Sequence, residues 1–193
     1  MDNEDKRQWV HLGVGGFALL IRWLTKVQAV GLAVLAIIFN VVVLPKLAPQ
    51  LFRDSEKSKG FMTGIIWYPV MVFLLMVFCP WEKKEIAAGA WAILACGDSF
   101  SNLIGRRFGK WKLPWNSKKS YAGLLGFLCL GIIGGSLLIY WVNPVWGLAR
   151  IILGATIASL IAGIGESLDL PIDDNVTVGV LSGIVLYVYF LLI

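Results

Sequence analysis

Long apolar runs constrain this chain more than any other feature of its sequence. Apolar stretches long enough to cross the roughly 30 Å hydrocarbon layer of a membrane occur at residues 9–24, 27–45, 61–79, 85–104, 121–142, 147–165 and 176–193. The composition agrees, since 58% of the residues are hydrophobic, only 15% are charged and the mean hydropathy is +0.78. The sequence therefore predicts an all-α, polytopic transmembrane helix bundle of about seven spans, in a multi-pass integral membrane protein.

The chain reads as one domain. No linker rich in Ser and Pro and no change of composition separates a soluble part, so we predict a single integral-membrane domain over residues 1–193. A signal peptide is the alternative for the first apolar run, but no small-residue cleavage site follows it and the next run begins almost at once. The cysteines Cys79, Cys96 and Cys129 stand alone within apolar runs, which indicates neither a zinc site nor a disulfide framework.

The Lys and Arg residues are distributed unevenly between the connections. With the N-terminus inside, twelve of the 17 lie on the cytoplasmic side and five on the other. Positive residues are enriched in cytoplasmic connections, so we predict a cytoplasmic N-terminus, an external C-terminus and a functional face on the cytoplasmic side. Topology, anionic lipid headgroups or a phosphorylated ligand account for the net charge of +5, and we expect no nucleic-acid partner.

A polar segment, CGDSFSNLIGRRFGKWKLPWNSKKSYAG at 96–123, interrupts the apolar runs. Asp98, Ser101 and Asn102 stand at i, i+3 and i+4 and so share one helix face. Such a stripe is costly against lipid and must face the bundle interior or a polar cleft, where ionisable residues are usually functional. Asp98 is therefore the first functional candidate. The alternative is a helix-end carboxylate that pairs with the arginines of the next loop.

That next loop is basic and rich in glycine. Glycines permit φ > 0 and a close approach of backbone N–H groups to a phosphate, and arginine offers forked donors to its oxygens. The loop lacks the Walker A spacing, and Trp111 and Trp115 are better interpreted as anchors at the membrane interface. The residues that we expect to bind a phosphorylated ligand are Gly105, Arg106, Gly109, Lys110, Asn116, Lys118, Lys119 and Ser120.

The last inside connection is acidic. Four carboxylates and one asparagine lie within residues 166–175, and this inside connection has no Lys or Arg. Oxygen ligands of this kind suit Mg²⁺ carried on a nucleotide. An ordinary solvated acidic turn is the alternative, although topology alone does not predict an inside loop without positive charge.

Arg7 and His11 lie four residues apart at the inner end of the first span, and His11 is the chain's only histidine. A lone histidine is more often structural, but an imidazole can donate to a phosphate or carry a proton near neutral pH. Its depth in the inner leaflet places it within reach of the other motifs. We therefore add Arg7 and His11 to the candidate nucleotide-binding residues.

Taken together, these motifs resemble a known family. The segments GDSFSNLIGRRFGKWKLPWNSKKSYAG and GESLDLPIDDNVTV, with FRDSEKSKG at 52–60 and Tyr68-Pro69, are similar to the membrane kinases of polyprenyl alcohols. The resemblance is strongest to phytol kinase, and dolichol kinase and the CTP-dependent diacylglycerol kinase are more distant. Ala122 stands where the two distant groups tend to have glutamate, which also favours the phytol kinase branch.

The resemblance implies a lipid kinase of isoprenoid metabolism. Such an enzyme transfers the γ-phosphoryl group of CTP, or of another nucleoside triphosphate, to a prenyl alcohol at the cytoplasmic membrane face. It also implies roles for Asp98 as the aspartate of a Gly-Asp motif, for the Gly105 to Lys110 loop and for the Lys119-Ser120 pair. Its later acidic motif corresponds to Glu166, Asp174 and Asn175.

Phosphoryl transfer depends mainly on positioning and charge neutralisation. We expect Arg106, Lys110 and Lys119 to hold the triphosphate, and either Asp98 or Glu166 to orient or deprotonate the alcohol. The predicted ligands of Mg²⁺ are Asp98, Asn102, Asp173, Asp174 and Asn175. A CTP-dependent CDP-lipid synthase of the phosphatidate cytidylyltransferase type is the alternative, and a small transporter is a weaker one. The sequence does not identify the alcohol or the oligomeric state.

Overall fold

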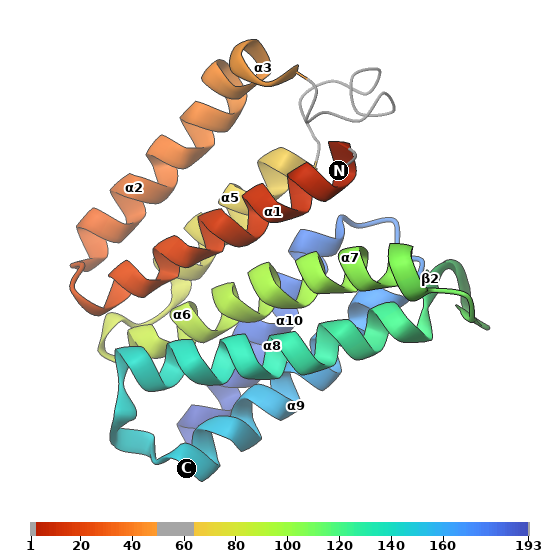
Figure 1. Ribbon diagram of the computed structural model, residues 1–193. Coiled ribbons are helices and arrows are strands. Elements are labelled where there is room, and N and C mark those ends of the chain that lie inside the picture. Colours follow the sequence, from red (N-terminus) through yellow and green to blue (C-terminus); the bar gives the residue numbers. More distant parts are fainter. Residues whose placement is uncertain (1–2, 50–63, 193) are drawn as a thin grey trace.

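The computed structural model describes residues 3–49 and 64–192, and helices dominate this part of the chain (Figure 1). The N-terminal half contains α1 (Asn3–Gly15), the 3-10 helix η1 (Gly16–Arg22), α2 (Lys26–Ile38), the π-helical η2 (Phe39–Val43), α3 (Leu44–Leu47) and α5 (Gly64–Phe78). The rest contains η4 (Trp81–Lys83), α6 (Lys84–Ala92), the π-helical η5 (Ile93–Asp98), α7 (Ser99–Phe108), α8 (Tyr121–Val142), η6 (Pro144–Trp146), α9 (Leu148–Ser167) and α10 (Asp174–Leu192). The predicted all-α class is confirmed.

One short antiparallel hairpin is the exception to this helical architecture. It pairs β1 (Lys112–Leu113) with β2 (Asn116–Ser120) and lies between α7 and α8. The predicted basic loop therefore has regular structure of its own. This structure fixes where the side chains of β2 point, because successive residues of a strand face opposite sides.

Four of the described helical segments are long and apolar enough to cross a membrane: Lys26–Leu47, Tyr121–Val142, Leu148–Ser167 and Asp174–Leu192. A fifth candidate span combines Gly64–Phe78 with Trp81–Phe108, two helices that are bent by 113° from each other. The first predicted span is helical as well, but it changes from α to 3-10 geometry at Gly15 and Gly16. The start of the third predicted span, 61–63, lies outside the described residues, and seven crossings with an inside N-terminus stay a prediction.

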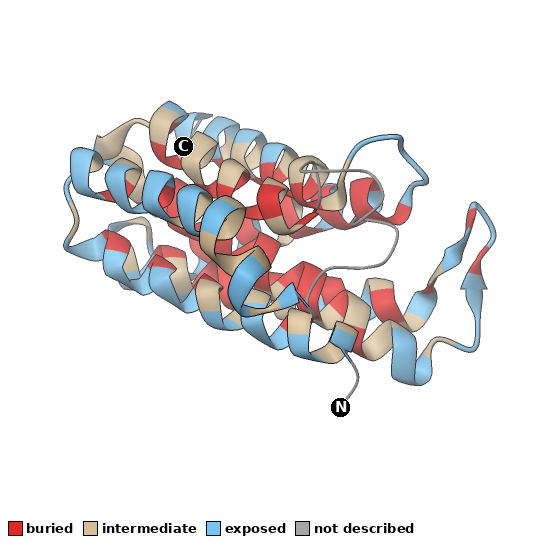
Figure 2. Ribbon diagram, turned by 90° about the horizontal axis from the view of Figure 1, so that it is seen from above, coloured by how far each residue is buried: buried red, intermediate tan, exposed pale blue. Residues whose placement is uncertain are grey.

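The core forms where the later helices pack together. α8 lies between the continuous α6–η5–α7 rod and α9, and α10 packs against α9, α5 and α6. Buried residues line the helix sides that face one another (Figure 2). Small residues allow the close approach: a Cβ added at Gly126 of α8 would lie 2.8 Å from Ile104 Cδ1 and 3.1 Å from the Phe100 carbonyl oxygen of α7. α2 packs against α5 and stands at the margin of the bundle (Figure 1).

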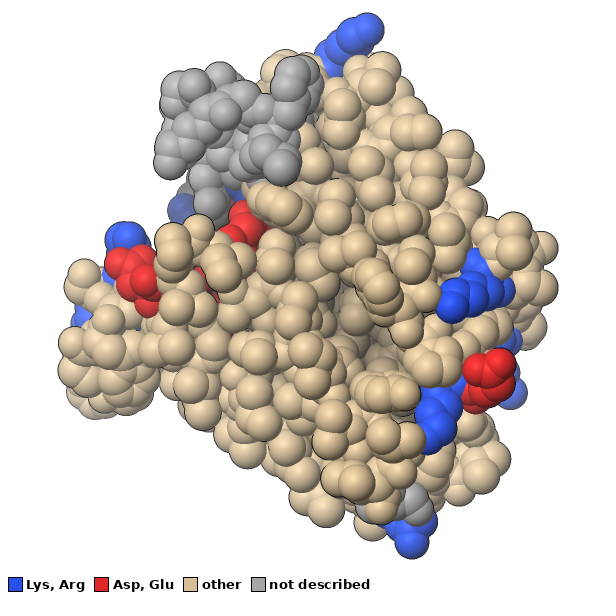
Figure 3. Space-filling view, turned by 180° about the vertical axis from the view of Figure 1, so that it is seen from behind, with Lys and Arg blue, Asp and Glu red and all other residues tan. Residues whose placement is uncertain are grey.

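The polar segments gather at the two ends of the bundle. The start of α1, the hairpin and the connection between α9 and α10 lie at one end (Figure 1). At the opposite end, Lys83 Nζ donates to the Phe190 carbonyl (2.7 Å) and Lys84 Nζ donates to the Arg22 carbonyl (2.7 Å). Figure 3 shows charged side chains at the margins of the molecule, around a broad uncharged middle. This pattern is the one expected of a protein embedded in a bilayer.

Candidate active site

Three carboxylates from separate helices meet at the end of the bundle that carries the hairpin. Asp98 ends η5, Glu166 lies near the end of α9 and Asp174 begins α10. One oxygen from each carboxylate lies within 4.8 Å of those of the other two. Asp98 and Glu166 are buried, and Asp174 is partly exposed. We call these three residues the carboxylate cluster.

The local sequence of α7 holds two members of the cluster in place. Asn102 Nδ2 donates a hydrogen bond to Asp98 Oδ1 (3.1 Å), and Ser101 Oγ donates to Glu166 Oε1 (3.1 Å). The shared face that the i, i+3, i+4 spacing predicted is therefore confirmed. Asp98 also lies at the end of a π-helical segment, a local widening of the helix that is frequent at functional sites.

Lys119 connects the hairpin to the carboxylate cluster. Its Nζ forms ion pairs with Glu166 Oε1 and, at 2.8 Å, with Asp174 Oδ2. Burial lowers the pKa of the Lys119 amine, but the nearby carboxylates of Glu166, Asp174 and Asp98 raise it by more. The net pKa is above the ordinary value of a lysine, so this ammonium group stays charged at neutral pH.

The charges of these four groups suit a divalent cation. Three carboxylates and one ammonium carry a net charge of about −2 when all are ionised. Carboxylate oxygens are the ligands that Mg²⁺ prefers, and the mutual distances within 4.8 Å allow one ion to contact more than one of them. The residues that could hold Mg²⁺ are thus Asp98, Glu166 and Asp174.

The other predicted metal ligands have different surroundings. Asp173 Oδ1 accepts hydrogen bonds from the backbone N–H (3.0 Å) and the Nδ2 group (2.7 Å) of Asn175. Asn175 Nδ2 also contacts the Gly64 carbonyl oxygen at 3.3 Å. A Cβ at Gly64 would lie 2.6 Å from Arg7 Nη2 and 3.3 Å from Asp173 Oδ2, so these side chains converge beside α5. Asn102 contacts the cluster only as a donor to Asp98.

The glycines of the basic segment do not adopt the positive φ that the sequence analysis expected. Gly105 lies within α7, and Gly109 has φ −78°; among the described residues only Gly147 has a positive φ. A Cβ at Gly105 would lie 3.3 Å from Ser120 Oγ and 3.4 Å from Gly123 Cα. The expectation of a positive φ at these glycines is therefore wrong, and Gly105 instead allows close packing of α7 against the start of α8; phosphate binding by this segment stays a prediction.

The arginines of α7 have acidic partners on α1. Arg106 Nη1 lies 3.5 Å from Asp5 Oδ1, and Arg107 Nη2 lies 3.6 Å from Asp5 Oδ2. Asp98 instead contacts Asn102 and faces His11, so its interpretation as a helix-end partner of these arginines is not supported. Arg106 and Lys110 are exposed, in the last turn of α7 and just after it. Asp5, two residues before Arg7, was not predicted as part of the site.

Three further predicted residues of the hairpin have structural contacts. Asn116 Nδ2 donates to the Ser167 carbonyl oxygen (3.1 Å) and fixes the hairpin against α9. Ser120 Oγ accepts from the Gly123 N–H (3.2 Å) and caps α8. Lys118 forms an ion pair of 3.0 Å with Asp169, and both side chains are exposed. None of these contacts involves a carboxylate of the cluster.

His11 approaches the carboxylate cluster from α1. Its Nε2 lies 4.0 Å from Asp98 Oδ2, and its ring lies against Tyr68 with the ring centroids 3.7 Å apart. The Tyr68 hydroxyl donates to the His11 carbonyl oxygen (3.2 Å) and accepts from Trp91 Nε1 (2.8 Å). In the sequence, Tyr68 was noted only for the resemblance and Trp91 was not noted. The contacts of Tyr68 with His11 and with Trp91 join different helices, and sequence spacing does not predict such contacts.

The known proteins to which the chain is similar include proteins named farnesol kinase and phytol kinase. The chain is 25% identical to a chloroplastic farnesol kinase of Arabidopsis thaliana over 95% of its length, which covers 65% of that relative. It is 27% identical to a probable chloroplastic phytol kinase of Zea mays, covering 75% of this chain and 49% of the relative. Phytol kinase 1 of Arabidopsis thaliana is 25% identical, with 69% and 46% covered. No family model and no solved structure matches the chain.

These relatives confirm the resemblance that the motifs predicted. The chain spans between about half and two thirds of the length of these curated relatives, as the covered shares of 46% to 65% show. The names describe those proteins.

Proposed function

Because the chain is related to proteins named phytol kinase and farnesol kinase, we propose that it is a prenol kinase. It transfers the γ-phosphoryl group of a nucleoside triphosphate to a prenyl alcohol at the cytoplasmic membrane face. CTP is the proposed donor, and its choice rests on the resemblance. The observation that carries the proposal is the meeting of Asp98, Glu166, Asp174 and Lys119 at one end of an apolar bundle.

The surroundings of the carboxylates suggest a division of their roles. Glu166 is held by Lys119 and Ser101, whereas Asp98 faces the imidazole of His11 across 4.0 Å. We assign Asp98 to the alcohol: its carboxylate orients the hydroxyl and accepts its proton. The alcohol oxygen then bonds to the γ-phosphorus, the bond from that phosphorus to the bridging oxygen breaks, and a nucleoside diphosphate leaves.

The cations of the site neutralise the triphosphate. Lys119 is partly buried, and Arg106 and Lys110 are exposed, Arg106 in the last turn of α7 and Lys110 just after this helix. Mg²⁺, when bound by Asp98, Glu166 and Asp174, supplies further neutralisation of the phosphate oxygens. The charge of the protein groups is then balanced, which removes the repulsion between the carboxylates and an anionic nucleotide.

The test is a transfer assay with purified protein in detergent. Each of the four nucleoside triphosphates, labelled at the γ-phosphate, is combined with a panel of prenols and Mg²⁺, and the lipid products are separated. We expect labelled prenyl phosphate and a nucleoside diphosphate in equal amounts, with CTP as the best donor. Release of pyrophosphate with formation of a CDP-lipid would contradict the kinase and support the synthase, and removal of Mg²⁺ by a chelator should abolish transfer.

A further inference from the structure

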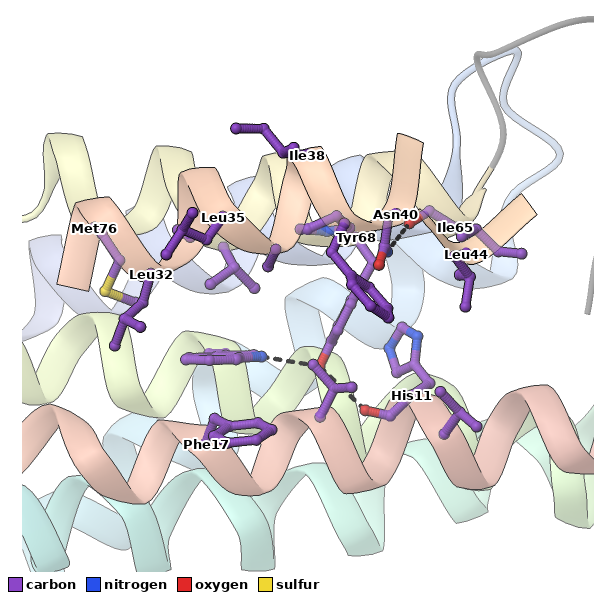
Figure 4. A pocket seen from close by; sticks show the side chains of 18 of the residues that line it. His11, Phe17, Leu32, Leu35, Ile38, Asn40, Leu44, Ile65, Tyr68 and Met76 are labelled. Carbon is purple, nitrogen blue, oxygen red and sulfur yellow. Dashed lines mark hydrogen bonds between the residues drawn. The ribbon is translucent and has the colours of Figure 1, made fainter. Parts of the chain in front are cut away.

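A large apolar cavity lies beside the carboxylate cluster. It has a volume of about 740 Å³ and is lined mainly by α1, η1, α2, η2 and α5. Figure 4 shows its lining, most of which is aliphatic or aromatic, as in Phe17, Leu32, Leu35 and Met76. Small-molecule sites commonly have volumes of roughly 300–1,000 Å³ and a few polar groups that fix orientation.

The polar groups of this cavity gather at one end. Arg7, His11, Asn40 and Tyr68 supply them, while the lining toward Ala29 is apolar. The Asn40 and Tyr68 side chains are engaged, since Asn40 Nδ2 donates to a backbone carbonyl at 2.8 Å and the Tyr68 hydroxyl donates to another at 3.2 Å. The cavity is therefore amphipathic along its length, with its polar end toward the carboxylate cluster.

Among the described residues that line the cavity, His11 has a buried side-chain nitrogen without a hydrogen-bond partner. Its Nε2 is buried and unpaired, which is costly unless a ligand completes the bond. Nε2 lies 4.0 Å from Asp98 Oδ2, and a hydroxyl oxygen can bridge such a gap with two hydrogen bonds of about 2.8 Å. With the imidazole proton on Nε2, the hydroxyl would accept from Nε2 and donate to the carboxylate.

We infer that this cavity binds the isoprenoid tail of the acceptor alcohol and that His11 and Asp98 hold its hydroxyl group. The inference rests on the proposed function and adds the position of the acceptor to it. It assigns His11 to the binding of the alcohol, whereas the sequence analysis assigned His11 to the binding of the nucleotide. From Asn40 of η2 to Ala29 of α2 the lining runs about 16 Å at 1.5 Å per residue, so the cavity limits the length of tail that it holds.

Two substitutions in α2 test the tail site. Ala33 and Ala36 line the cavity, and Val34 on the same helix does not. Ala33→Phe and Ala36→Phe should shorten the cavity and lower kcat/KM for geranylgeraniol relative to geraniol by about tenfold or more, since misfit of this kind is discriminated by roughly 10- to 200-fold. The matched control Val34→Phe should keep the wild-type ratio.

A substitution of His11 tests the hydroxyl site. His11→Phe preserves a ring against Tyr68 and removes Nε2, so the KM for the alcohol should rise about tenfold for one lost hydrogen bond, while the KM for the nucleotide stays at the wild-type value. His11→Gln, which retains a polar nitrogen, should restore part of the loss. A raised KM for the nucleotide with an unchanged KM for the alcohol would return His11 to the donor site and overturn the inference.

The outcomes separate this inference from the proposed function. If the wild type phosphorylates prenols and both Phe variants keep its chain-length preference, the cavity is not the tail site and the kinase proposal stands. If the wild type phosphorylates no prenol, both proposals are wrong.

Thermal unfolding in detergent shows whether each variant is folded. A photoreactive farnesol analogue gives a readout on the wild type alone: cross-links to α2 and α5 support the tail site, and cross-links only elsewhere overturn it.

Discussion

At the scale of single residues, two adjacent lysines of β2 have opposite surroundings. Lys119 is partly buried and pairs with Glu166 and Asp174, whereas Lys118 is exposed and pairs with the exposed Asp169. The alternation of side chains along a strand produces this difference. An exposed ion pair contributes only about 0–1 kcal/mol, while a preorganised cation in a transfer site has a large effect on the rate.

We therefore expect Lys119→Gln to lower kcat by about 100-fold or more, the usual effect of removing one preorganised charge-stabilising donor. Lys118→Gln is the matched control, and its kcat and thermal unfolding should stay close to those of the wild type. The transfer assay with CTP and a prenol measures both. Equal losses in the two variants would show that Lys119 has no special role.

The sequence predicted the residues of the site better than their contacts. The i, i+3, i+4 spacing placed Ser101 and Asn102 on the face of Asp98, because helix periodicity is local. The contact of Lys119 with Glu166 joins residues 47 positions apart, and it depends on a hairpin that has no strong periodic signal. The same limit applies to Tyr68 and Trp91, which tertiary packing alone brings to His11.

At the scale of elements, the close contact of α7 and α8 positions the cluster. Asp98, Ser101 and Lys119 are carried by this pair of helices and the hairpin between them. Gly126 is the residue that permits the approach, since a Cβ there would meet Ile104 and a backbone oxygen of α7 at 2.8 and 3.1 Å. A substitution at this contact should therefore disturb the carboxylate cluster, although Gly126 contacts none of its residues.

Gly126→Ala should destabilise the protein by about 1–3 kcal/mol, the usual cost of overpacking a tight contact. Gly31→Ala on α2 is the matched control, because a Cβ there meets no atom within 4 Å among the described residues and alanine favours a helix by up to about 1 kcal/mol over glycine. Thermal unfolding in detergent compares the two. An unchanged midpoint for Gly126→Ala would mean that α7 and α8 separate easily.

The apolar runs predicted where the helices lie, because length and hydropathy are properties of the sequence alone. They did not predict the π-helical segments η2 and η5 or the 3-10 geometry of η1, which depend on local packing. The hairpin at 112–120 was also missed. Its strands are too short and too polar to show the alternation by which strands are recognised.

At the scale of the whole molecule, the fold brings distant segments to one end of the bundle. The start of α1, the hairpin and the start of α10 meet there, and they hold Asp5, Lys119 and Asp174 respectively (Figure 1). Charge distribution in the sequence predicted this convergence. It could not predict the cavity that α2 forms with α1 and α5, because this cavity depends on how α2 packs on α5.

The central claim is that Asp98 and Asp174, 76 positions apart in the sequence, act in one phosphoryl-transfer centre. The most direct test measures kcat for prenol phosphorylation by Asp98→Asn, Asp174→Asn and the double variant, with the exposed Asp169→Asn as control. We predict that each single substitution lowers kcat by about 100-fold or more and that the control keeps the wild-type kcat. The effects of substitutions at residues that act as a unit do not add, so the double variant should be no slower than the slower single variant. Wild-type turnover by Asp98→Asn, or losses that multiply in the double variant, would contradict the account.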